Sequence, residues 1–429
     1  MPATLQLALD FANLSQALRV AEEAAPAGPV WLEAGTPLIK SEGLDCVRRL
    51  RAAFPQHTIV ADMKTMDAGR AEVEMAAKAG ANVVAVLGAA SDSTIAECVE
   101  AGHHYGAQIM VDLCEVADPV ARARRVEELG ASIIGVHCAI DVQMVGGSPL
   151  DTLREVAAAV SVPVAVAGGL NSETAPVAVA AGASIVIVGG AISKAPDAEA
   201  ATRAILEAIA SGQAAETQLY KRVGLEGVRD TLARCQTAHI CDAMHRAGWL
   251  PGPKPIKLGL RCVGPAFTVW TYPGDWSRPV RAIDEAQPGE VLVIDVRGEA
   301  PAVWGEEATR SAKGKGLAGV VIHGAARDSA QIRALDFPLF CTRVAPVAGD
   351  PKGIGRMRVP LRIGETDVWP GDWVVGDDDG VVVVPQGRAV EVANRALAVL
   401  EREDRELAEI DAGHTLAEVG ELSRWEQHR

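Results

Sequence analysis

The feature that most constrains the fold is a series of eight short apolar runs within the first 210 residues. The runs start about 22 to 30 residues apart, and the segments between them have helical periodicity. Continuous apolar strands that alternate with helices indicate a parallel sheet covered by helices. Eight such units predict a (β/α)8 barrel over residues 1–210, whereas a doubly wound open sheet would need fewer strands. The runs are LQLALD (5–10), VWLEAG (30–35), TIVADMK (58–64), NVVAVLG (82–88), AQIMVDL (107–113), SIIGVH (132–137), VPVAVAGG (162–169) and SIVIVGG (184–190).

The composition changes after residue 210. Trp31 is the only one of the eight Trp residues that precedes this point. Residues 211–222 are polar and small at their start, which is typical of a linker. Beyond them, short apolar runs broken by Pro and Gly predict a second α/β domain with mixed sheets over residues 223–429. The overall fold class is therefore α/β, with a TIM barrel followed by a different α/β domain.

Charge and composition exclude several classes of protein. The chain has 41 Lys and Arg against 56 Asp and Glu, a net charge of −15, which argues against a nucleic-acid surface. We expect no membrane span, because no apolar stretch is long enough and free of charges. The eight Cys include no close C-x-x-C pair, so we expect reduced thiols and a cytoplasmic location.

Barrels carry their chemistry where the strands end. Side chains alternate along a strand, so Asp62 and Lys64 are expected to point together into the mouth, with Asp67 in the following loop. Glu33 and Asp62 are hard carboxylates on adjacent strands, which suits Mg²⁺. Double glycines after the last two strands leave backbone N–H groups open to a phosphate. The predicted strand ends carry Asp10, Glu33, Asp62, Lys64, Asp112, His137, Gly168, Gly169, Gly189 and Gly190.

Each of these residues also has a structural interpretation. Asp62 and Lys64 could form a buried ion pair that only satisfies itself, and His137 could be a hydrogen-bonded core histidine. Asp10 and Asp112 could cap the helices that follow them. The convergence of Glu33 and His137 with the Asp62–Lys64 pair at neighbouring strand ends favours a functional site.

These segments resemble the 3-hexulose-6-phosphate synthase family of the orotidine-monophosphate decarboxylase superfamily. The motifs are LALDFANL, WLEAGTPLIKSEG, VADMKTMDAG, AAKAGANVVAVLGAA, VAVAGGLNSET and IVIVGGAISKA, and the likeness covers about residues 5–205. It implies a barrel dimer that condenses formaldehyde with ribulose 5-phosphate, or catalyses the reverse cleavage. It also implies that Glu33 and Asp62 bind Mg²⁺, that Lys64 stabilises an enediolate, and that His137 is the acid/base. Asp67 would reach the site of the partner subunit, and Asp10 and the glycine pairs would bind the substrate.

The segment after the sixth strand departs from the family pattern. It reads HCAIDVQ (137–143), where Asp141 and Gln143 keep the pattern and Cys138, Ala139 and Val142 differ. The related 3-keto-L-gulonate-6-phosphate decarboxylases have an arginine where this chain has Ile140, which cannot position a proton donor. This argues against decarboxylation and leaves another ketose phosphate as the alternative substrate.

The second domain has its own candidate site. An apolar strand, GVVIHGA, ends just before the adjacent Arg327 and Asp328, and twenty residues separate Glu306 from Arg327. An arginine fork binds a carboxylate, and carboxylates hold divalent metals, although an Arg-Asp pair on the surface is the structural alternative.

This region resembles the RraA-like family, which includes an RNase E regulator and class II pyruvate aldolases. The likeness covers about residues 225–415. It implies that Glu306 and Asp328 bind Mg²⁺ or Mn²⁺, and that Arg327 and the Gly305 backbone bind a 2-oxo acid. A glutamate of a neighbouring subunit's C-terminal helix, for which Glu403 is the first candidate and Glu401 and Glu406 the others, would complete the site.

The two resemblances predict a fused, homo-oligomeric enzyme. Its partners are a sugar phosphate and formaldehyde at the barrel, and a 2-oxo acid at the second domain. The barrel family forms dimers, and the RraA-like family forms trimers or hexamers. A non-catalytic regulator of an RNase, or an oligomerisation module, is the alternative for the second domain.

Overall fold

The computed structural model describes residues 3–420 and 422. The chain divides into two compact units, which we treat separately. Unit 1 comprises the residues up to Arg222 together with those from Glu401 onward, and unit 2 comprises Val223–Leu400. Unit 2 starts where the sequence places the second domain, but the described residues from Glu401 onward belong with the barrel.

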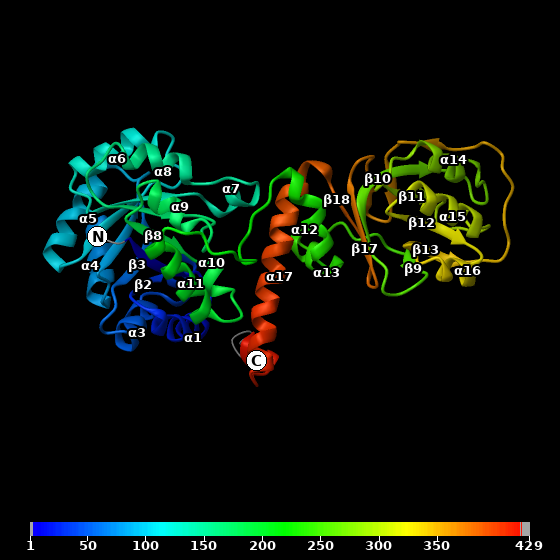
Figure 1. Ribbon diagram of the computed structural model, residues 1–429. Coiled ribbons are helices and arrows are strands. Elements are labelled where there is room, and N and C mark those ends of the chain that lie inside the picture. The colour runs from blue at the N-terminus through cyan, green and yellow to red at the C-terminus, as the bar shows by residue number, and fades with distance from the viewer. Residues whose placement is uncertain (1–2, 421, 423–429) are drawn as a thin grey trace, which may run out of the picture. The chain divides into compact units, whose positions relative to one another are not determined.

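Unit 1 is a closed barrel of eight parallel strands in the order β1 to β8, as the sequence predicts. Figure 1 shows the helices arranged around these strands. The strands are β1 (Thr4–Leu9), β2 (Val30–Ala34), β3 (Ile59–Thr65), β4 (Val83–Leu87), β5 (Gln108–Asp112), β6 (Ile133–His137), β7 (Val164–Ala167) and β8 (Ile185–Val188).

The helices of the barrel follow the strands in sequence. Local capping explains several of their starts: Asn13 Oδ1 accepts from Gln16 N at 3.1 Å to begin α1, and Asp118 Oδ1 accepts from Ala121 N at 3.0 Å to begin α6. The helices are α1 (Leu14–Ala24), α2 (Thr36–Glu42), α3 (Asp45–Ala53), α4 (Gly69–Ala79), α5 (Asp92–Tyr105), α6 (Pro119–Glu128), α7 (Ile140–Met144), α8 (Leu150–Ala157), α9 (Ala175–Ala180), α10 (Gly190–Ser193) and α11 (Ala198–Ser211).

Strand alternation decides which side chains enter the barrel. Leu5, Leu7 and Leu9 are fully buried in the layer between strands and helices, so Gln6 between them faces the interior. The interior is closed by a separate apolar cluster of Val60, Val83, Ala85, Met110, Ile133, Ala165 and Ile185. Further along the same strands come polar residues: Asp62 and Asp112 lie two residues after Val60 and Met110, and His137 lies four residues after Ile133. The apolar layer therefore forms a floor beneath a polar mouth.

Unit 2 is a mixed sheet in the order β18-β17-β10-β11-β12-β13-β9, with β14 paired to β10 and a separate β15–β16 hairpin. The central strands β10 to β13 are parallel, and β17 and β18 join antiparallel. The strands are β9 (Lys254–Pro255), β10 (Cys262–Trp270), β11 (Val291–Asp295), β12 (Gly319–Ala326), β13 (Leu339–Val344), β14 (Arg356–Met357), β15 (Leu361–Ile363), β16 (Thr366–Val368), β17 (Trp373–Asp377) and β18 (Gly380–Val384).

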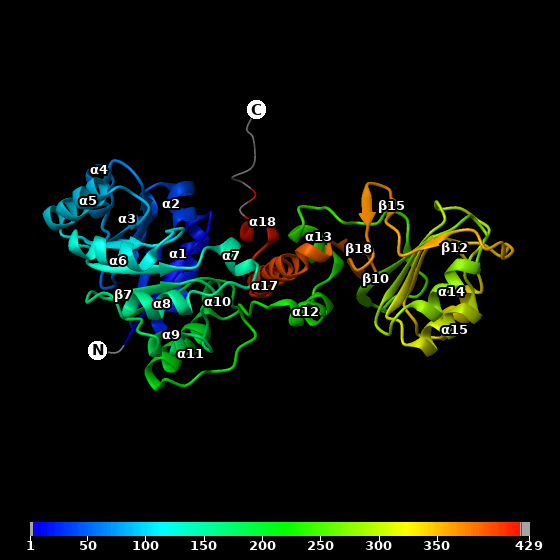
Figure 2. The ribbon, with the colours of Figure 1, turned by 90° about the horizontal axis from the view of Figure 1, so that it is seen from above.

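The faces of the unit 2 sheet bury different apolar sets. Ile294 and Ile322 lie in one cluster together with residues of α14 and α15, whereas Val293 and Val321 lie in another with Phe340. Figure 2 shows α14 and α15 on one side of the sheet. The remaining helices are α12 (Val228–Arg234), α13 (Thr237–Ala243), α14 (Ser277–Glu285), α15 (Glu306–Lys315), α16 (Ser329–Ala334), α17 (Ala389–Asp411) and α18 (Leu416–Val419).

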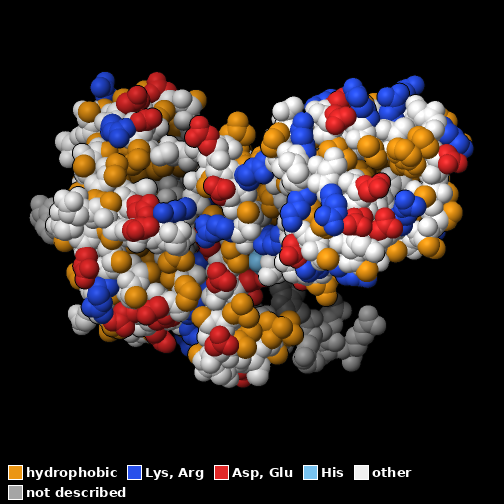
Figure 3. All heavy atoms as spheres, turned by 45° about the vertical axis from the view of Figure 1, so that its right-hand side comes forward, with side chains coloured by type: hydrophobic (Ala, Val, Ile, Leu, Met, Phe, Trp, Pro, Cys, Tyr) orange, Lys and Arg blue, Asp and Glu red, His pale blue; other side chains and the backbone are white. Residues whose placement is uncertain are grey.

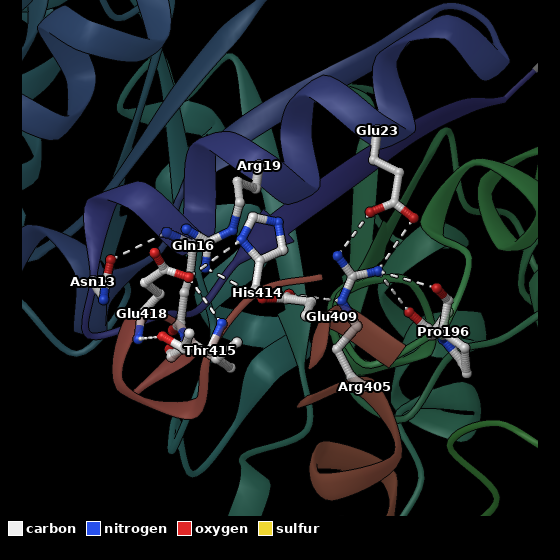
Figure 4. A network of polar contacts seen from close by, with 12 residues as sticks. Asn13, Gln16, Arg19, Glu23, Pro196, Arg405, Glu409, His414, Thr415 and Glu418 are labelled. Carbon is white, nitrogen blue, oxygen red and sulfur yellow. Dashed lines mark hydrogen bonds and ion pairs between the residues drawn. The ribbon is translucent and has the colours of Figure 1, made fainter. Parts of the chain in front are cut away.

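The end of α17 packs on the barrel through polar contacts (Figure 4). Arg405 Nη2 pairs with Glu23 Oε2 at 2.8 Å, and Arg19 Nη2 pairs with Glu409 Oε2 at 3.3 Å. Gln16 Nε2 donates to the carbonyl of Val419 at 2.9 Å, which also anchors α18. These contacts to α1 explain why the residues beyond 400 belong to unit 1.

The surface is charged but mixed. On the face shown in Figure 3, basic and acidic side chains are interspersed rather than gathered into one basic field. Within residues 3–420 and 422, no helix has both the length and the apolar composition needed to cross a bilayer.

Candidate active site

Lys64 lies at the centre of the polar mouth of the barrel. Its Nζ is 3.0 Å from Asp62 Oδ2 and 2.7 Å from Asp112 Oδ2. The backbone of Lys64 is left-handed, with φ 47°, where the pairing of β3 with β4 shifts register. Burial alone would lower the pKa of the ammonium, but Asp62 and Asp112 raise it well above its usual value. Lys64 therefore remains a fixed positive charge.

Asp112 joins Lys64 to His137. Its Oδ2 is 3.0 Å from His137 Nδ1, and its Oδ1 accepts from Cys114 N at 2.9 Å. Burial acts against the charged form, yet the hydrogen bond and charge of His137, followed by Lys64, lower the pKa of Asp112 to about 2. Asp112 does not cap a helix, since Asp118 does so for α6. From the sequence, Asp112 could be either a helix cap or a site residue; in the structure its carboxylate contacts Lys64 and His137 instead of capping a helix.

Two further carboxylates, Glu33 and Asp10, crowd the same mouth as Asp62. Gln6 Nε2 donates to Glu33 Oε2, and Thr36 Oγ1 donates to Asp62 Oδ2 at 2.7 Å. Burial, then the charges of Asp62 and Asp10, raise the pKa of Glu33 well above its usual value. The pKa of Asp10 is also raised, first because protein displaces water around it and then by Asp62. Gln6 and Thr36 orient these carboxylates and were missed from the sequence, because nothing in their local pattern marks them.

The crowded carboxylates fit a magnesium ion. No group of three or more His, Cys, Asp or Glu within residues 3–420 and 422 is arranged to hold a metal alone. Mg²⁺, however, is commonly held by one or two carboxylates, with water and substrate oxygens completing the octahedron. Glu33 and Asp62 supply such a pair, and a cation beside them would offset the repulsion that raises the pKa of Glu33.

Two cavities meet at His137. The inner one, of about 40 Å³, is lined by Glu33, Asp62, Lys64 and Asp112 as well as His137. The outer one, of about 400 Å³, is lined by His137 and by the loops after β5 and β6, including Cys138, Val142 and Pro149. The inner cavity is too small for a sugar phosphate, whereas the outer one falls in the size range of small-molecule sites. His137 therefore stands between the charged mouth and the space that can admit a substrate.

The glycine pairs lie together at the carboxyl ends of the paired strands β7 and β8. Gly168 and Gly169 have φ of 117° and 70°, which only glycine adopts without strain. Gly189 faces Asp10, because a Cβ at that position would be 3.5 Å from Asp10 Oδ2. The predicted phosphate-binding positions are thus neighbours, and they border the same mouth as the carboxylates.

Asp67 stands apart from these groups within one chain. It is exposed, its Oδ1 accepts from Ala68 N at 2.7 Å, and it lines a separate cavity of about 400 Å³ with Arg70 and Glu74. The carboxylates that hold Lys64 are therefore Asp62 and Asp112. Whether Asp67 serves a partner's site, as the resemblance implies, stays a prediction.

Three of the candidate residues of unit 2 border a cavity of about 370 Å³, namely Gly305, Arg327 and Asp328. Asp328, with φ 57°, accepts from Glu306 N at 3.2 Å through Oδ2, and Arg327 Nε is 3.6 Å from the same oxygen. Gly305 must lack a side chain, since a Cβ there would lie 2.5 Å from Asp328 Oδ2. The side chain of Glu306 instead pairs with Arg310 Nη2 at 2.7 Å.

The acidic residues that line the unit 2 cavity are Glu307, Asp328 and Asp350, and Glu306 is not among its lining residues. Of the C-terminal glutamates, Glu401 is buried and accepts from Tyr220 N at 2.7 Å within unit 1. Arg327, Asp328 and Gly305 thus meet as the sequence indicates, whereas Glu306 and Glu401 are engaged elsewhere.

Comparisons with known proteins agree with both halves. Residues 3–205 match the model of the orotidine 5′-phosphate decarboxylase / HUMPS family, and residues 237–383 match the model of the Aldolase/RraA family. The barrel is 41% identical over 206 residues to a 3-hexulose-6-phosphate synthase of Mycobacterium gastri, covering 48% of this chain and 99% of that protein. It is also 41% identical over 204 residues to a 3-hexulose-6-phosphate synthase of Methylomonas aminofaciens, covering 47% of this chain and 97% of that protein.

Among solved structures, Streptomyces coelicolor RraAS2, an unusual member of the RNase ES inhibitor RraA protein family, is 32% identical. The match covers 44% of this chain and 100% of that one, with a TM-score of 0.40. On the family models and the sequence identities, the chain belongs through its barrel to the orotidine 5′-phosphate decarboxylase / HUMPS family, and carries an RraA-like domain fused behind it.

Proposed function

We propose that the barrel is a Mg²⁺-dependent 3-hexulose-6-phosphate synthase, which condenses formaldehyde with ribulose 5-phosphate or catalyses the reverse cleavage. The relatives at 41% identity bear this name. The observation that carries the proposal is the chain of contacts from Asp62 through Lys64 and Asp112 to His137. This arrangement places a fixed cation beside an oriented base, which is what formation of an enediolate requires.

His137 is the group that moves the proton at C1 of the sugar phosphate. Because Asp112 stays ionised at its low pKa, its Oδ2 accepts a hydrogen bond, so His137 Nδ1 carries the proton. The lone pair of Nε2 is then left to take a proton from carbon, and the resulting imidazolium is stabilised by Asp112. The enediolate attacks the carbonyl carbon of formaldehyde, and the new alkoxide takes up a proton.

Lys64 stabilises the negative charge that develops on the sugar oxygens. The ammonium is already positive and held by Asp62 and Asp112, so it does not reorganise as charge forms. Glu33 and Asp62 would hold the Mg²⁺, which supplies Lewis-acid polarisation of the sugar oxygens when bound. The apolar floor beneath them keeps water from the enediolate.

The segment after β6 bears on the choice of substrate. Ile140 begins α7 and is 48% exposed, so no cation occupies this position to support a decarboxylation. Gln143 is buried and donates to the Cys138 carbonyl at 2.8 Å, which fixes the loop that follows His137. Another phosphorylated ketose that forms the same enediolate is the alternative substrate.

The test is consumption of formaldehyde with ribulose 5-phosphate and Mg²⁺. We expect wild-type activity that is lost with EDTA and in Asp62→Ala, and that falls by about 10³-fold or more in Asp112→Asn, because the amide can no longer fix the His137 tautomer. Arg203→Gln, on the outer helix α11, is the control and should retain activity. A folded wild type that consumes no formaldehyde would refute this substrate pair, and other ketose phosphates would be tried.

For the RraA-like domain we propose metal-dependent cleavage or decarboxylation of a 2-oxo acid. Its support is the cavity where Arg327 can bind a carboxylate and Asp328 a Mg²⁺ or Mn²⁺ ion. A non-catalytic regulator of an RNase, or an oligomerisation module, is the second candidate, favoured by the engagement of Glu306 with Arg310.

Pyruvate release from oxaloacetate and from 4-hydroxy-4-methyl-2-oxoglutarate, with Mn²⁺ titrated by calorimetry, separates these candidates. We expect turnover that Arg327→Lys reduces by at least tenfold and Asp328→Ala abolishes together with metal binding, while Arg333→Lys on α16 changes neither. Absence of both turnover and metal binding in the wild type would favour the regulator.

A further inference from the structure

The segment that follows the barrel lies on its predicted phosphate-binding end. Residues 215–221 run across the loop after β7, where three successive side chains hold them. The contacts are Ser172 Oγ to the Ala215 carbonyl at 2.7 Å, Thr217 N to Glu173 Oε1 at 3.0 Å, Asn171 Nδ2 to the Leu219 carbonyl at 3.3 Å, and Lys221 Nζ to Glu173 Oε1 at 3.0 Å. This segment is therefore part of the barrel surface rather than a free tether.

Tyr220 covers the glycine pair after β8. A Cβ on Gly190 would lie 2.1 Å from Tyr220 Cε2, so the ring fills the space that any side chain at position 190 would take. The glycine is thus required by the linker as well as by any anion at its backbone N–H. Burial raises the pKa of the Tyr220 phenol, and Asp10 is among the charges that act on it. Because Gly189 faces Asp10 and the adjacent Gly190 faces Tyr220, the ring lies beside the active-site mouth.

Arg222 is buried against the same ring. Its side chain is 7% exposed, and its guanidinium carbon lies 3.9 Å from the Tyr220 ring centroid. Its Nε and Nη2 find no hydrogen-bond partner among residues 3–420 and 422, and its nearest anion is Glu401 Oε2 at 3.6 Å. A buried guanidinium with unused donors is costly unless a ligand accepts from them.

Lys194 adds a second cation beside the Tyr220 ring, and we call Lys194, Tyr220 and Arg222 the cluster. Its Nζ is 5.5 Å from the Tyr220 centroid, on the loop that follows the β8 glycines. Burial lowers its pKa to about 8; Glu401 opposes the shift, and Arg222 and Arg402 add to it. Lys194 and Arg222 thus place two cations around the Tyr220 ring.

The end of α17 braces the cluster from outside. Glu401 Oε1 accepts from Tyr220 N at 2.7 Å, and one turn later Arg405 Nη1 donates to the Ala195 carbonyl at 3.0 Å. These residues, at i and i+4, hold the linker and the β8 loop against each other.

We propose that Arg222, with Tyr220 and Lys194, forms part of the phosphate site of the barrel, so that residues outside the (β/α)8 fold complete its substrate pocket. The ligand is the phosphomonoester dianion of the sugar phosphate, and the proposal rests on the function proposed above. Arginine suits this role because its planar fork binds phosphate oxygens in pairs. Without phosphate, the Arg222 guanidinium pairs with the Glu401 carboxylate, and the bound phosphate takes the place of that carboxylate.

The test measures binding of inorganic phosphate to the full-length protein by calorimetry, together with kcat and KM for ribulose 5-phosphate. Arg222→Gln is expected to raise both the phosphate Kd and the KM at least tenfold, with kcat within about threefold, and Arg222→Lys should restore part of the loss. Arg203→Gln, an equal charge change in an exposed pair with Glu199, is the matched control.

Glu401→Gln separates an anion site from a structural tether. The amide oxygen can still accept from Tyr220 N, but the competing negative charge is gone, so phosphate should bind at least twofold more tightly. General destabilisation cannot produce this gain. If Glu401→Gln fails to tighten phosphate binding, or if Arg222→Gln folds and binds phosphate as the control does, the proposal is wrong. The first criterion applies even when Arg222→Gln fails to fold.

Phosphate binding does not depend on turnover, so the two proposals can fail separately. A wild type that consumes no formaldehyde but shows the expected phosphate responses would retain the linker site and lose the synthase assignment. A protein that consumes formaldehyde but whose phosphate affinity is unchanged in both Arg222→Gln and Glu401→Gln would retain the synthase assignment and lose the linker site.

Discussion

Lys194 is a half-buried amine whose proton affinity is set by its surroundings. Its pKa falls from the ordinary 10.5 to about 8, so between these values the unfolded chain holds a proton that the folded chain has released. The free energy of unfolding contributed by Lys194 therefore rises with pH through this window, and the penalty for its burial is fully present below pH 8.

Replacing this amine should remove the penalty. We expect Lys194→Met to be more stable than wild type near pH 7, by about 1 to 3 kcal/mol because each pKa unit corresponds to about 1.4 kcal/mol, and the difference should shrink by about pH 9.5. Urea unfolding at both pH values measures it. Lys78→Met, at a side chain that is 63% exposed, is the control. An equal advantage at both pH values would show that Lys194 is not the titrating group.

The residues of the site differ in how well local sequence predicts them. Asp62 and Lys64 follow an apolar run, and the expected contact between their side chains forms. It forms, however, where the strand departs from regular alternation, because the backbone of Lys64 is left-handed and the register shifts there. Asp112 occupies an equivalent position, but a carboxylate before a helix can equally be a cap, and only the fold shows that Asp118 caps α6. Gln6 and Thr36 act through contacts to Glu33 and Asp62 on other segments, so no local pattern could reveal them.

At the level of elements, helix α17 presents one edge to the barrel. Glu401, Arg405 and Glu409 are spaced four residues apart, and all three contact residues of the first stretch of unit 1, which ends at Arg222. The Arg405 side chain is only 12% exposed and donates to Glu23 and to the Ala195 carbonyl. Its contacts tie the helix to both α1 and the β8 loop.

Arg405→Gln should therefore destabilise the protein. We expect a loss of about 2 kcal/mol, because buried acceptors lose a charged donor, and a decrease in Tm of about 4 to 8 °C. Arg402→Gln, one turn earlier on a side chain that is 57% exposed, should change Tm by less than about 2 °C. Thermal unfolding followed by circular dichroism compares them. Similar Tm values for the two variants would mean that Arg405 does not anchor the helix.

The elements of the barrel were more predictable than those contacts. Parallel strands buried on both faces need continuous apolar runs, and all eight predicted runs form the barrel strands. The charge pattern of α17 predicts a solvated helix, but alternating signs look the same whether the partners are water or charges on α1. The distinction depends on residues nearly 400 positions away, such as Arg19 and Glu409.

For the whole molecule, the sequence predicts a second domain over residues 223–429, and unit 2 comprises Val223–Leu400. The polar segment before Val223 is a local signal. The return of the chain to unit 1 at Glu401 has no such signal, because it falls inside one continuous helix, α17 (Ala389–Asp411). A boundary within a helix is invisible to any search for turns, glycines or changes in composition.

The division of unit 1 into two separated stretches has a consequence for biosynthesis. A ribosome makes every strand of the barrel first and then the whole of unit 2. Only afterwards does it make the last part of α17, which contains Glu401 and Arg405. At about 5 to 20 residues per second, the nascent barrel waits about 10 to 40 s with Arg222 and the β8 loop unbraced. During that interval the barrel can close, but its β8 end lacks the contacts from Glu401 and Arg405, so a chaperone or an anion in the cell would meet a different surface from that of the mature protein.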